Sequence, residues 1–393
     1  MQHRHRRILT VCHEYPPIGG GGASAVRILA EEQARAGCEV TVLTSRMGDL
    51  PRRERRAGVE IIRTSCRRRA RHYSTASELA TWIPGALAAG YRLLRSQPFD
   101  TIHAHFIVPG AAVAVPLARM FGIPLTLTAH GSDVPGYNPD RFDMIHRLIG
   151  PAWRYLVNSA DRVTLPSAHL GGLLAAAGGQ EAVLVANPFA GEGSVLVRER
   201  VPGRILAATR LVPRKGVQDL IAAVAGMKEP TELIVAGDGP QAPKLKELAA
   251  ERQCPVNFSG FLEREALAEL YATSSIFVLP SSHENFPMVL LEAMGAGCAV
   301  VTTTAPGCRE VVGDAGLCVP PSDVDALREA LVRLVRDPAL VQDLAARGRR
   351  RVAQFAPDLI AKEFDRVYRS SAEAGSRRST WFGGQPRVHP GIH

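Results

Sequence analysis

The 393-residue chain is longer than one hydrophobic core usually supports, so two domains are expected. With 46% hydrophobic and 22% charged residues, its composition is that of an ordinary globular protein and argues against a disordered or fibrous chain. The formal net charge of +9 comes mainly from the first half, because residues 1–200 hold 24 arginines, no lysine and 16 acidic residues.

Cysteine usage and the apolar segments predict a cytoplasmic protein. The seven cysteines are odd in number and include no C-x-x-C pair, so free buried thiols in a reducing compartment are expected. The first apolar run, near residue 10, is too short for a signal peptide. The longest apolar stretch, residues 106–129, is interrupted by Pro109, Pro116 and Pro124, and no membrane-spanning helix is predicted.

Strands and helices alternate along the first half, which predicts βαβ units on a parallel sheet. The predicted strands are residues 7–12, 39–45, 58–64, 100–106, 123–129 and 162–167, and the predicted helices are residues 23–37 and 109–122. The alternation lapses around residues 183–204. We therefore expect a first domain over residues 1–188 and a linker over residues 189–203.

The alternation restarts in the second half and predicts a second domain over residues 204–357. Its predicted strands are residues 204–209, 232–236, 256–260, 276–280 and 299–303, and its predicted helices are residues 217–227, 244–252, 264–274 and 288–294. A last amphipathic helix is expected over residues 358–371, packed toward the first domain, before a disordered tail over residues 372–393. The predicted fold class is α/β, with two Rossmann-like domains facing across a cleft.

Two glutamates, Glu284 and Glu292, are the most informative residues of the chain. Glu284 follows a buried strand and Glu292 lies inside the next helix, which begins near Pro287, so both are expected at the carboxyl edge of a parallel sheet. Exposed N–H groups of residues 286–288 add donors at the same edge. Carboxylates with amides suit a ligand rich in hydroxyls, namely a sugar and a ribose.

Two cations, Arg210 and Lys215, stand between a strand and a helix, just before Gly216. A guanidinium and an ammonium suit a diphosphate. The alternative is a pair of solvated cations at a helix start, although cations there oppose the helix dipole. A tight turn at residues 236–240, which contains Gly239, follows the next strand and is either a second ligand contact or an ordinary turn.

A glycine run, Gly19 to Gly22, follows the first strand and opens a helix. Dinucleotide binding requires G-x-G-x-x-G and an acid after the second strand, yet that strand ends in Thr44, Ser45 and Arg46, so NAD binding is not expected. The run still allows close approach of a phosphate or an acceptor.

Three histidines fall at strand ends. His130 precedes Gly131 and is a candidate for function, His105 is an even choice between function and structure, and His103 is assigned to core or support. No metal site is predicted from this pair, because further ligands are not evident. Asp323 and Asp325 imitate a D-x-D metal motif, but a capping box of Ser322 and Asp325 at a helix start is favoured.

Taken together, these motifs resemble the retaining glycosyltransferases of family 4, which have the GT-B fold. The resemblance covers Arg6 to about Tyr368 and is most specific over residues 257–320, where HENFPMVLLEAMGAGCAVV contains both glutamates. PPIGGGGASAV, TAHGSD, TRLVPRKG and AGDGP match in order and spacing. Two departures are Pro287 and Thr209, where many relatives have glycine.

The resemblance implies a role for each candidate residue. Arg210 and Lys215 would hold the donor diphosphate, Glu292 the ribose, and Glu284 the transferred sugar, while His130 would lie near the anomeric carbon. The remaining donor-binding residues would be Gly20, Gly21, Gly239, Leu262, Asn285, Phe286, Pro287 and Met288. His105 and Gly19 would lie on the acceptor side.

The implied reaction moves a sugar from a nucleotide-diphosphate sugar to an acceptor hydroxyl with retention, and neither a metal nor another cofactor is expected. Cations and a helix N-terminus would stabilise the leaving diphosphate. A GT-B nucleotide-sugar epimerase, a glycan phosphorylase and a non-catalytic nucleotide-sugar sensor are the alternatives.

The arginine cluster Arg52–Arg71 and the following stretch, residues 79–94 with Trp82 and Tyr91, suggest contact with an anionic membrane surface. A solvated loop is an equal alternative, and nucleic acid is not favoured because no base-stacking aromatics accompany the arginines. Membrane contact would place the enzyme on the inner face of the plasma membrane and favour a lipid-linked or polysaccharide precursor as acceptor.

Overall fold

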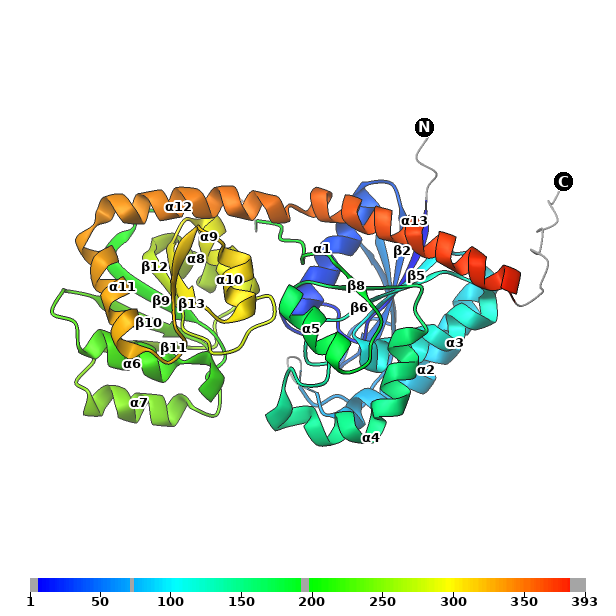
Figure 1. The fold of residues 1–393 in the computed structure, drawn as a ribbon, viewed down its shortest axis with the longest axis horizontal. Helices are drawn as coiled ribbons and strands as arrows, with labels where there is room; N and C mark the ends of the chain where they lie inside the picture. The colour runs from blue at the N-terminus through cyan, green and yellow to red at the C-terminus, as the bar shows by residue number, and fades with distance from the viewer. Residues whose placement is uncertain (1–5, 71–73, 192–197, 382–393) are drawn as a thin grey trace. The chain divides into compact units, whose positions relative to one another are not determined.

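The computed structural model describes residues 6–70, 74–191 and 198–381. The chain divides into two compact units, each built on one sheet flanked by helices (Figure 1). Unit 1 comprises Met1–Pro188 and Pro357–His393, and unit 2 comprises Phe189–Ala356.

Unit 1 contains an eight-stranded sheet in the order β3-β4-β2-β1-β5-β6-β7-β8, parallel except at β3. Its strands are β1 (Arg7–Val11), β2 (Glu39–Arg46), β3 (Arg53–Arg56), β4 (Val59–Ser65), β5 (Thr101–His105), β6 (Leu125–Thr128), β7 (Arg162–Leu165) and β8 (Ala182–Leu184). Its helices are α1 (Gly21–Arg35), α2 (Ala76–Ser96), the π-helical turn η1 (Ile107–Ala111), α3 (Ala112–Phe121), α4 (Pro139–Asn158), α5 (Ala168–Ala176) and α13 (Pro357–Trp381).

Unit 2 contains a six-stranded parallel sheet in the order β11-β10-β9-β12-β13-β14. Its strands are β9 (Val201–Ala208), β10 (Glu232–Ala236), β11 (Val256–Gly260), β12 (Ser274–Leu279), β13 (Ala299–Thr303) and β14 (Gly316–Val319). Its helices are η2 (Pro213–Lys215), α6 (Val217–Ala225), α7 (Ala242–Glu251), α8 (Arg264–Thr273), α9 (Met288–Ala296), α10 (Pro306–Val312), α11 (Val324–Arg336), α12 (Pro338–Val352) and η3 (Ala353–Phe355).

The central strands form the core of each unit. In unit 2 every residue of β12 and β13 is buried, as expected for parallel strands covered on both faces. In unit 1 the core on one face of the sheet includes Trp82 and Trp153, and the core on the other face includes Ile8 and Val42. The α/β fold class predicted from the alternating pattern is confirmed.

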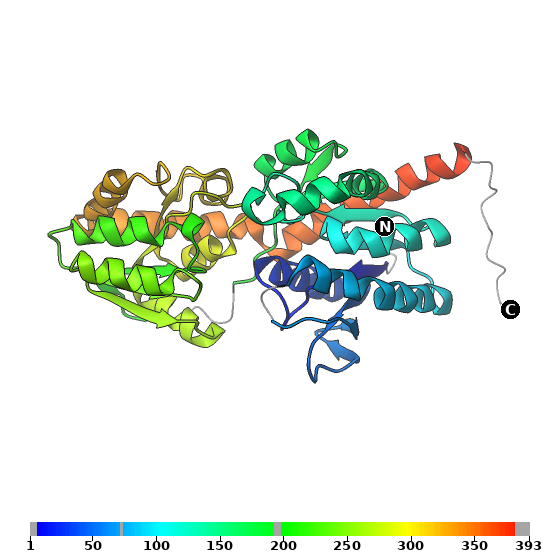
Figure 2. The same ribbon diagram turned by 90° about the horizontal axis from the view of Figure 1, so that it is seen from below.

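The hairpin of β3 and β4 is a feature that the sequence pattern did not predict. β3 has the sequence RERR, is largely exposed and pairs antiparallel with β4 at the sheet edge, where it projects from unit 1 (Figure 2). A charged strand without apolar alternation carries no strand signal, because an edge strand exposed on both faces needs none.

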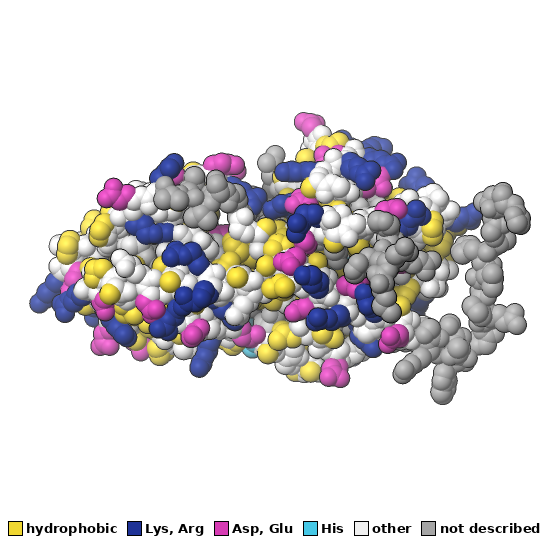
Figure 3. Space-filling model, turned by 90° about the horizontal axis from the view of Figure 1, so that it is seen from above, with side chains coloured by type: hydrophobic (Ala, Val, Ile, Leu, Met, Phe, Trp, Pro, Cys, Tyr) yellow, Lys and Arg dark blue, Asp and Glu magenta, His cyan; other side chains and the backbone are white. Residues whose placement is uncertain are grey.

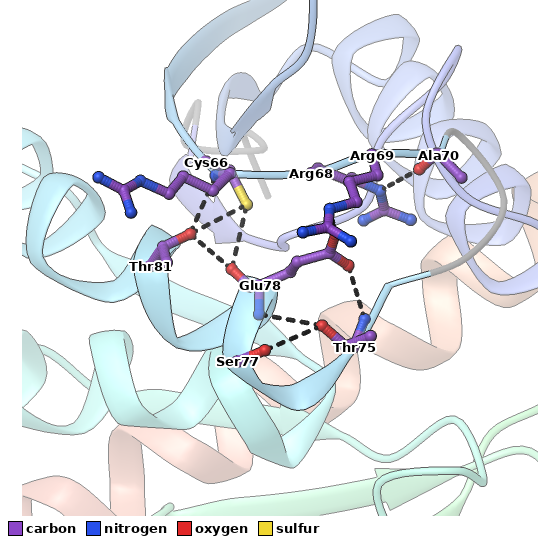
Figure 4. A network of polar contacts seen from close by, with 9 residues as sticks. Cys66, Arg68, Arg69, Ala70, Thr75, Ser77, Glu78 and Thr81 are labelled. Atoms are coloured by element: carbon purple, nitrogen blue, oxygen red, sulfur yellow. Dashed lines mark hydrogen bonds and ion pairs between the residues drawn. The ribbon is translucent and has the colours of Figure 1, made fainter.

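Helix α2 begins with a capping box that follows the arginine-rich segment (Figure 4). The Thr75 hydroxyl accepts a hydrogen bond from the Glu78 N–H at 3.3 Å, and the Glu78 carboxylate accepts one from the Thr75 N–H at 2.8 Å. Two backbone donors of the first turn are thereby satisfied, which fixes where the helix starts.

Two predicted boundaries need correction. Strand β9 begins at Val201, inside the predicted linker of residues 189–203, of which residues 192–197 lie outside the described chain. Helix α13 continues to Trp381 rather than ending at 371, because Ala372, Glu373 and Ala374 favour helix, so the predicted disordered tail of residues 372–393 is wrong up to Trp381. The rest of the tail, residues 382–393, lies outside the described chain.

The cap of α11 was assigned to the wrong residue. The Asp323 carboxylate, not the Ser322 hydroxyl, accepts the hydrogen bond from the Ala326 N–H, at 2.9 Å. Ser322 has a φ of 61° and lies one residue before the cap. Asp323 therefore caps the helix, as one residue of this segment was predicted to do.

Helix α13 packs on α1 although the two are far apart in the sequence. Ile360, Phe364 and Tyr368 are buried in the same core cluster as Val26 and Leu29 of α1. The Gln33 amide N–H donates a hydrogen bond to the Tyr368 hydroxyl at 2.8 Å. The last described helix is therefore an integral part of unit 1.

Candidate active site

The strand order places one switch point in each sheet. In unit 2 the order reverses between β9 and β12, and in unit 1 it reverses between β1 and β5. Ligands of open parallel sheets bind at the carboxyl ends of the strands beside such points. The loops that follow these four strands carry most of the residues predicted from the sequence.

In unit 2, the turn after β9 is held tightly against the end of β12. Gly216 ends η2 with a φ of 68°, and a Cβ at this position would lie 2.1 Å from the Pro280 carbonyl oxygen. The Ser282 N–H donates to the Arg214 carbonyl oxygen at 2.9 Å. Glycine is therefore required at 216, and its contact with Pro280 brings Lys215 beside the loop that follows β12.

Lys215 and Glu284 form an ion pair in this structure. The Glu284 carboxylate also accepts a hydrogen bond from the Ser281 hydroxyl at 2.8 Å, and Glu284 is only 7% exposed. Both residues lie at the carboxyl edge of the sheet, as their strand-end positions predicted, but the ion pair between them was not predicted. A half-buried lysine held by a buried carboxylate presents a fixed cation to an anionic ligand.

Glu292 has a different partner. It lies in α9, and its carboxylate accepts a hydrogen bond from the Tyr271 hydroxyl of α8 at 3.0 Å. Burial raises the pKa of Glu292, although the bond from Tyr271 opposes this shift. Tyr271 was not predicted as a site residue, because in the sequence it is one apolar-face residue of a helix among several.

The other donor-side candidates lie around the same sheet edge. Arg210 is exposed shortly after β9. The turn containing Gly239 is joined to that loop by the hydrogen bond from the Leu211 N–H to the Asp238 carbonyl oxygen, at 2.9 Å.

The loop before α9 and the end of β11 hold the remaining candidates. Asn285 is buried, and Pro287 is the N-cap residue of α9, one residue before Met288. The Phe286 ring packs against Phe355 with 5.6 Å between centroids. Leu262 follows β11 and is half-buried.

In unit 1, the glycine run lies between the end of β1 and the N-terminus of α1. Gly19 has a φ of 107°, and a Cβ there would lie 2.8 Å from the Glu14 carboxylate. Gly20 precedes the first turn of α1, which begins at Gly21. The run therefore lies directly over Glu14, a residue that the sequence pattern did not select.

Glu14 forms a buried ion pair with Arg68 of the arginine-rich segment, at 2.7 Å. The Arg68 side chain is fully buried, and His13 Nε2 lies 3.6 Å from the same carboxylate. Burial acts to raise the pKa of Glu14, but His13 and the Arg68 guanidinium outweigh it and hold the pKa below its ordinary value. In the sequence, the indication that Glu14 belongs to the site was its position just beyond the end of a predicted strand.

The loop after β6 is organised by Asp133. Its buried carboxylate accepts hydrogen bonds from the backbone N–H groups of Ile107, His130 and Gly131, at 2.7, 3.0 and 2.8 Å. Asp133 was also missed, because the TAHGSD segment was read for its histidine and glycine. The carboxylate fixes the backbone of His130, and burial lowers the pKa of that imidazole to about 4.

His103 and His105 lie next to His130. His103 is fully buried and hydrogen-bonded on both ring nitrogens, which confirms its predicted supporting role. His105 Nδ1 lies 3.1 Å from His130 Nε2. Across residues 6–70, 74–191 and 198–381, no group of three or more His, Cys, Asp or Glu side chains is arranged to hold a metal ion.

Several of the arginines assigned to a membrane surface are engaged within the protein. Arg53 pairs with Glu60, Arg63 with Glu54, and Arg68 with Glu14. Trp82, which was expected on the same surface, is fully buried in the core, so that part of the prediction is wrong. On the face shown in Figure 3, basic and acidic side chains are interspersed.

Within the described chain, no helix is both long and apolar enough to cross a membrane. All seven cysteines are free, and Cys12, Cys254, Cys298 and Cys308 are buried, as predicted.

Comparisons with known proteins identify the class to which this fold and site belong. The family model "Glycosyl transferases group 1" matches residues 199–351, and the model "Glycosyltransferase Family 4" matches residues 19–188. The 2-deoxystreptamine N-acetyl-D-glucosaminyltransferase of Streptomyces fradiae is 32% identical over 382 residues, covering 89% of this chain and 88% of that protein. The chain belongs to the family 4, group 1 glycosyltransferases of the GT-B fold.

Other relatives and solved structures agree with this assignment. The glycogen synthase of Mycobacterium tuberculosis is 29% identical over 418 residues, covering 97% of each chain. The sucrose-phosphate synthase of Thermosynechococcus elongatus superposes with a TM-score of 0.77 at 24% identity, covering 94% of this chain and all of that one. HepE of Anabaena, solved with UDP-glucose, gives a TM-score of 0.71 at 19% identity, covering 93% and 100%.

These matches support glycosyl transfer and do not favour the epimerase, phosphorylase or sensor alternatives.

Proposed function

We propose that this glycosyltransferase moves a sugar from a nucleotide-diphosphate sugar to an acceptor hydroxyl, with retention of configuration and without a metal ion. The observation that carries the proposal is the Lys215–Glu284 ion pair, held beside the switch point of unit 2 by the contact of Gly216 with Pro280. A solved relative of the same fold, HepE, contains UDP-glucose, which supports a donor of this class.

The proposed donor site uses one kind of side chain for each part of the ligand. Lys215 and Arg210 bind the diphosphate, Glu292 binds the ribose hydroxyls, and Glu284 binds the transferred sugar. As the bond from C1 to oxygen breaks, negative charge develops on the leaving diphosphate. Two cations and the backbone N–H groups at the start of α9 stabilise that charge, which is the contribution that a metal ion makes in other enzymes.

The acceptor is assigned to unit 1, where the glycine run and His130 meet. Attack of the acceptor hydroxyl on the face of the sugar that the diphosphate leaves gives retention, with an oxygen of the leaving phosphate taking the hydroxyl proton. No base from the protein is required in this scheme. A polysaccharide or lipid-linked precursor is the proposed acceptor class.

Thermal-shift measurements with UDP-, GDP- and ADP-sugars test the donor site. A bound donor stabilises the protein by RT ln(1 + [L]/Kd), about 2.7 kcal/mol at one hundred times Kd, so the correct base and sugar are identified together. The shift should disappear in Arg210→Ala and persist in Lys244→Ala, in which an exposed lysine of the same unit is removed. A shift that survives loss of Arg210 would place the donor elsewhere.

Two further measurements address the reaction. The product's anomeric configuration, read by NMR, should match the donor's, and an inverted product would exclude retention. Transfer should continue in excess EDTA at its rate with Mg²⁺, and loss of transfer on chelation would show that a metal is required.

We propose contact with an anionic membrane through fewer arginines than the sequence suggested. Arg55, Arg56 and Arg67 are exposed on or near the β3–β4 hairpin. Each basic residue near an anionic surface contributes up to about 1 kcal/mol. Sedimentation with vesicles that contain phosphatidylserine should exceed that with phosphatidylcholine alone and fall in an Arg55→Glu, Arg56→Glu variant. Equal sedimentation with both vesicles would remove the proposal.

A further inference from the structure

Three histidines of unit 1 lie side by side at the ends of β5 and β6. His105 Nδ1 is 3.1 Å from His130 Nε2, so one of these two nitrogens must carry the proton of a hydrogen bond. The His103 ring packs on His105 with 4.0 Å between centroids. Both imidazoles of the His105–His130 pair are neutral near pH 7, because burial lowers the pKa of each.

The tautomer of His103 follows from its partners. The Gln33 amide donates to the Tyr368 hydroxyl, which leaves the Tyr368 proton to be donated to His103 Nδ1 at 2.8 Å. His103 must then carry its own proton on Nε2, where it is donated to Thr128 Oγ1 at 2.7 Å. Both nitrogens of His103 are therefore occupied, and neither is available to His105.

The second nitrogen of His105 decides the direction of the bond to His130. His105 is 2% exposed, and its Nε2 has no hydrogen-bond partner among the described residues. A proton on this nitrogen would be a buried N–H without an acceptor, an arrangement that is rarer in proteins than an under-used lone pair. The proton of His105 therefore belongs on Nδ1, where His130 Nε2 accepts it.

This assignment fixes His130 as well. Since its Nε2 accepts, neutral His130 carries its proton on Nδ1, the nitrogen on the side of the glycine run, where a Cβ at Gly22 would lie 3.5 Å away. The backbone of His130 is held separately by the Asp133 carboxylate, at 3.0 Å. Asp133 thus positions the main chain of His130, and His105 sets which ring nitrogen of His130 is the hydrogen-bond donor.

We propose that His105 is a positioning residue, which holds His130 in the Nδ1–H tautomer so that a hydrogen-bond donor is directed at the glycine run. The kinetic consequence rests on the proposed function: an oxygen of the sugar or acceptor would accept this hydrogen bond. The tautomer assignment itself concerns only the free protein. It reassigns His105 from direct contact with the acceptor to support of His130.

Long-range ¹H–¹⁵N correlation spectra of the histidine-labelled protein test the assignment directly, since they distinguish protonated from bare ring nitrogens. At pH 8 the protonated nitrogen should be Nε2 in His103 and Nδ1 in both His105 and His130. In His105→Leu, His130 should lose the Nδ1–H preference, and His105→Asn, whose amide replaces the Nδ1 donor, should restore it. Tyr368→Phe is the matched control, because it removes a bond to His103 and leaves the His105–His130 pair intact.

Steady-state kinetics provide the second measurement. His105→Leu should lower kcat/KM at least about tenfold, the loss expected from one misdirected hydrogen bond, and His105→Asn should recover most of it. An Nε2–H tautomer of His130 in the native protein, or an unchanged one in His105→Leu, would overturn the assignment. If the histidines have the predicted tautomers but the protein transfers no sugar, the tautomer assignment is supported and the proposed function is refuted.

Discussion

Acidification is expected to destabilise unit 1, because buried neutral histidines must gain protons when it unfolds. Burial lowers the pKa of His103 from 6.5 to about 3 and that of His13 to about 4. As the pH falls below 6.5, the unfolded chain binds protons at these positions and the folded protein does not. The associated stability is therefore complete above about pH 6.5 and is lost as the pH falls toward the folded pKa values.

The size of the effect follows from the two shifts. Between pH 8 and pH 5, an imidazole that titrates near 6.5 when unfolded and near 3 or 4 when folded reduces the free energy of unfolding by about 2 kcal/mol. His13 and His103 are 5% and 0% exposed, so solvent screening does not reduce these values appreciably. Together they remove about 4 kcal/mol, a large fraction of the stability of a typical domain.

Tryptophan fluorescence isolates this unit, because Trp82, Trp153 and Trp381 all belong to it. Urea titrations at pH 8 and pH 5 should show the predicted loss in the native protein. In His103→Gln the difference between the two pH values should shrink by about 2 kcal/mol, whatever the variant's absolute stability. His283→Gln, in unit 2, should leave it unchanged. Identical pH dependence in His103→Gln and the native protein would refute the argument from burial.

Three further outcomes concern unit 2. Lys215→Ala should lower turnover at least about 100-fold, because losing about 3 kcal/mol of transition-state stabilisation slows a reaction about 100-fold. Near-native turnover would show that Lys215 is not part of the site. Gly216→Ala should lower the free energy of unfolding by at least about 2 kcal/mol, because the new Cβ would meet the Pro280 carbonyl oxygen and residue 216 has a left-handed backbone. Circular dichroism measures this loss, and unchanged melting would contradict the contact. Tyr271→Phe should weaken donor binding five- to tenfold, or by about 1 kcal/mol, because Glu292 loses the hydrogen bond that orients it, and kcat should change little. Calorimetry that shows unchanged affinity would disprove this role of Tyr271.

Residues that follow buried strands were the most predictable part of the site. Apolar runs locate parallel strands, and their carboxyl ends must meet at one edge, so Lys215 and Glu284 could be expected at the same edge of the sheet. Their ion pair was not predicted. Gly216 was expected to let the backbone approach a ligand, not another loop. Its contact with Pro280 depends on the packing of two loops and could not be derived.

Pairings set by tertiary packing were not predictable. Glu14 and Arg68 are separated by 54 positions, and no periodicity links them. Tyr271 and Asp133 occur in a helix and a loop whose patterns indicate only packing or a turn. The β3 edge strand has no apolar alternation, since nothing covers it. For Glu14 and Tyr271 the hydrogen-bond partner lies far away in the sequence, and for β3 the neighbour is solvent.

The placement of α13 has a consequence for how the protein is made. The ribosome releases the strands of unit 1 first, but the helix that covers Ile8 and Val26 and supplies the Tyr368 hydroxyl to His103 emerges only after the whole of unit 2. Until synthesis is complete, part of one flank of the first sheet stays uncovered and Nδ1 of His103 lacks its hydrogen-bond partner. Nascent chains stopped before residue 357 should therefore be captured by chaperones that bind exposed apolar surface, even though every strand of both sheets has already been translated.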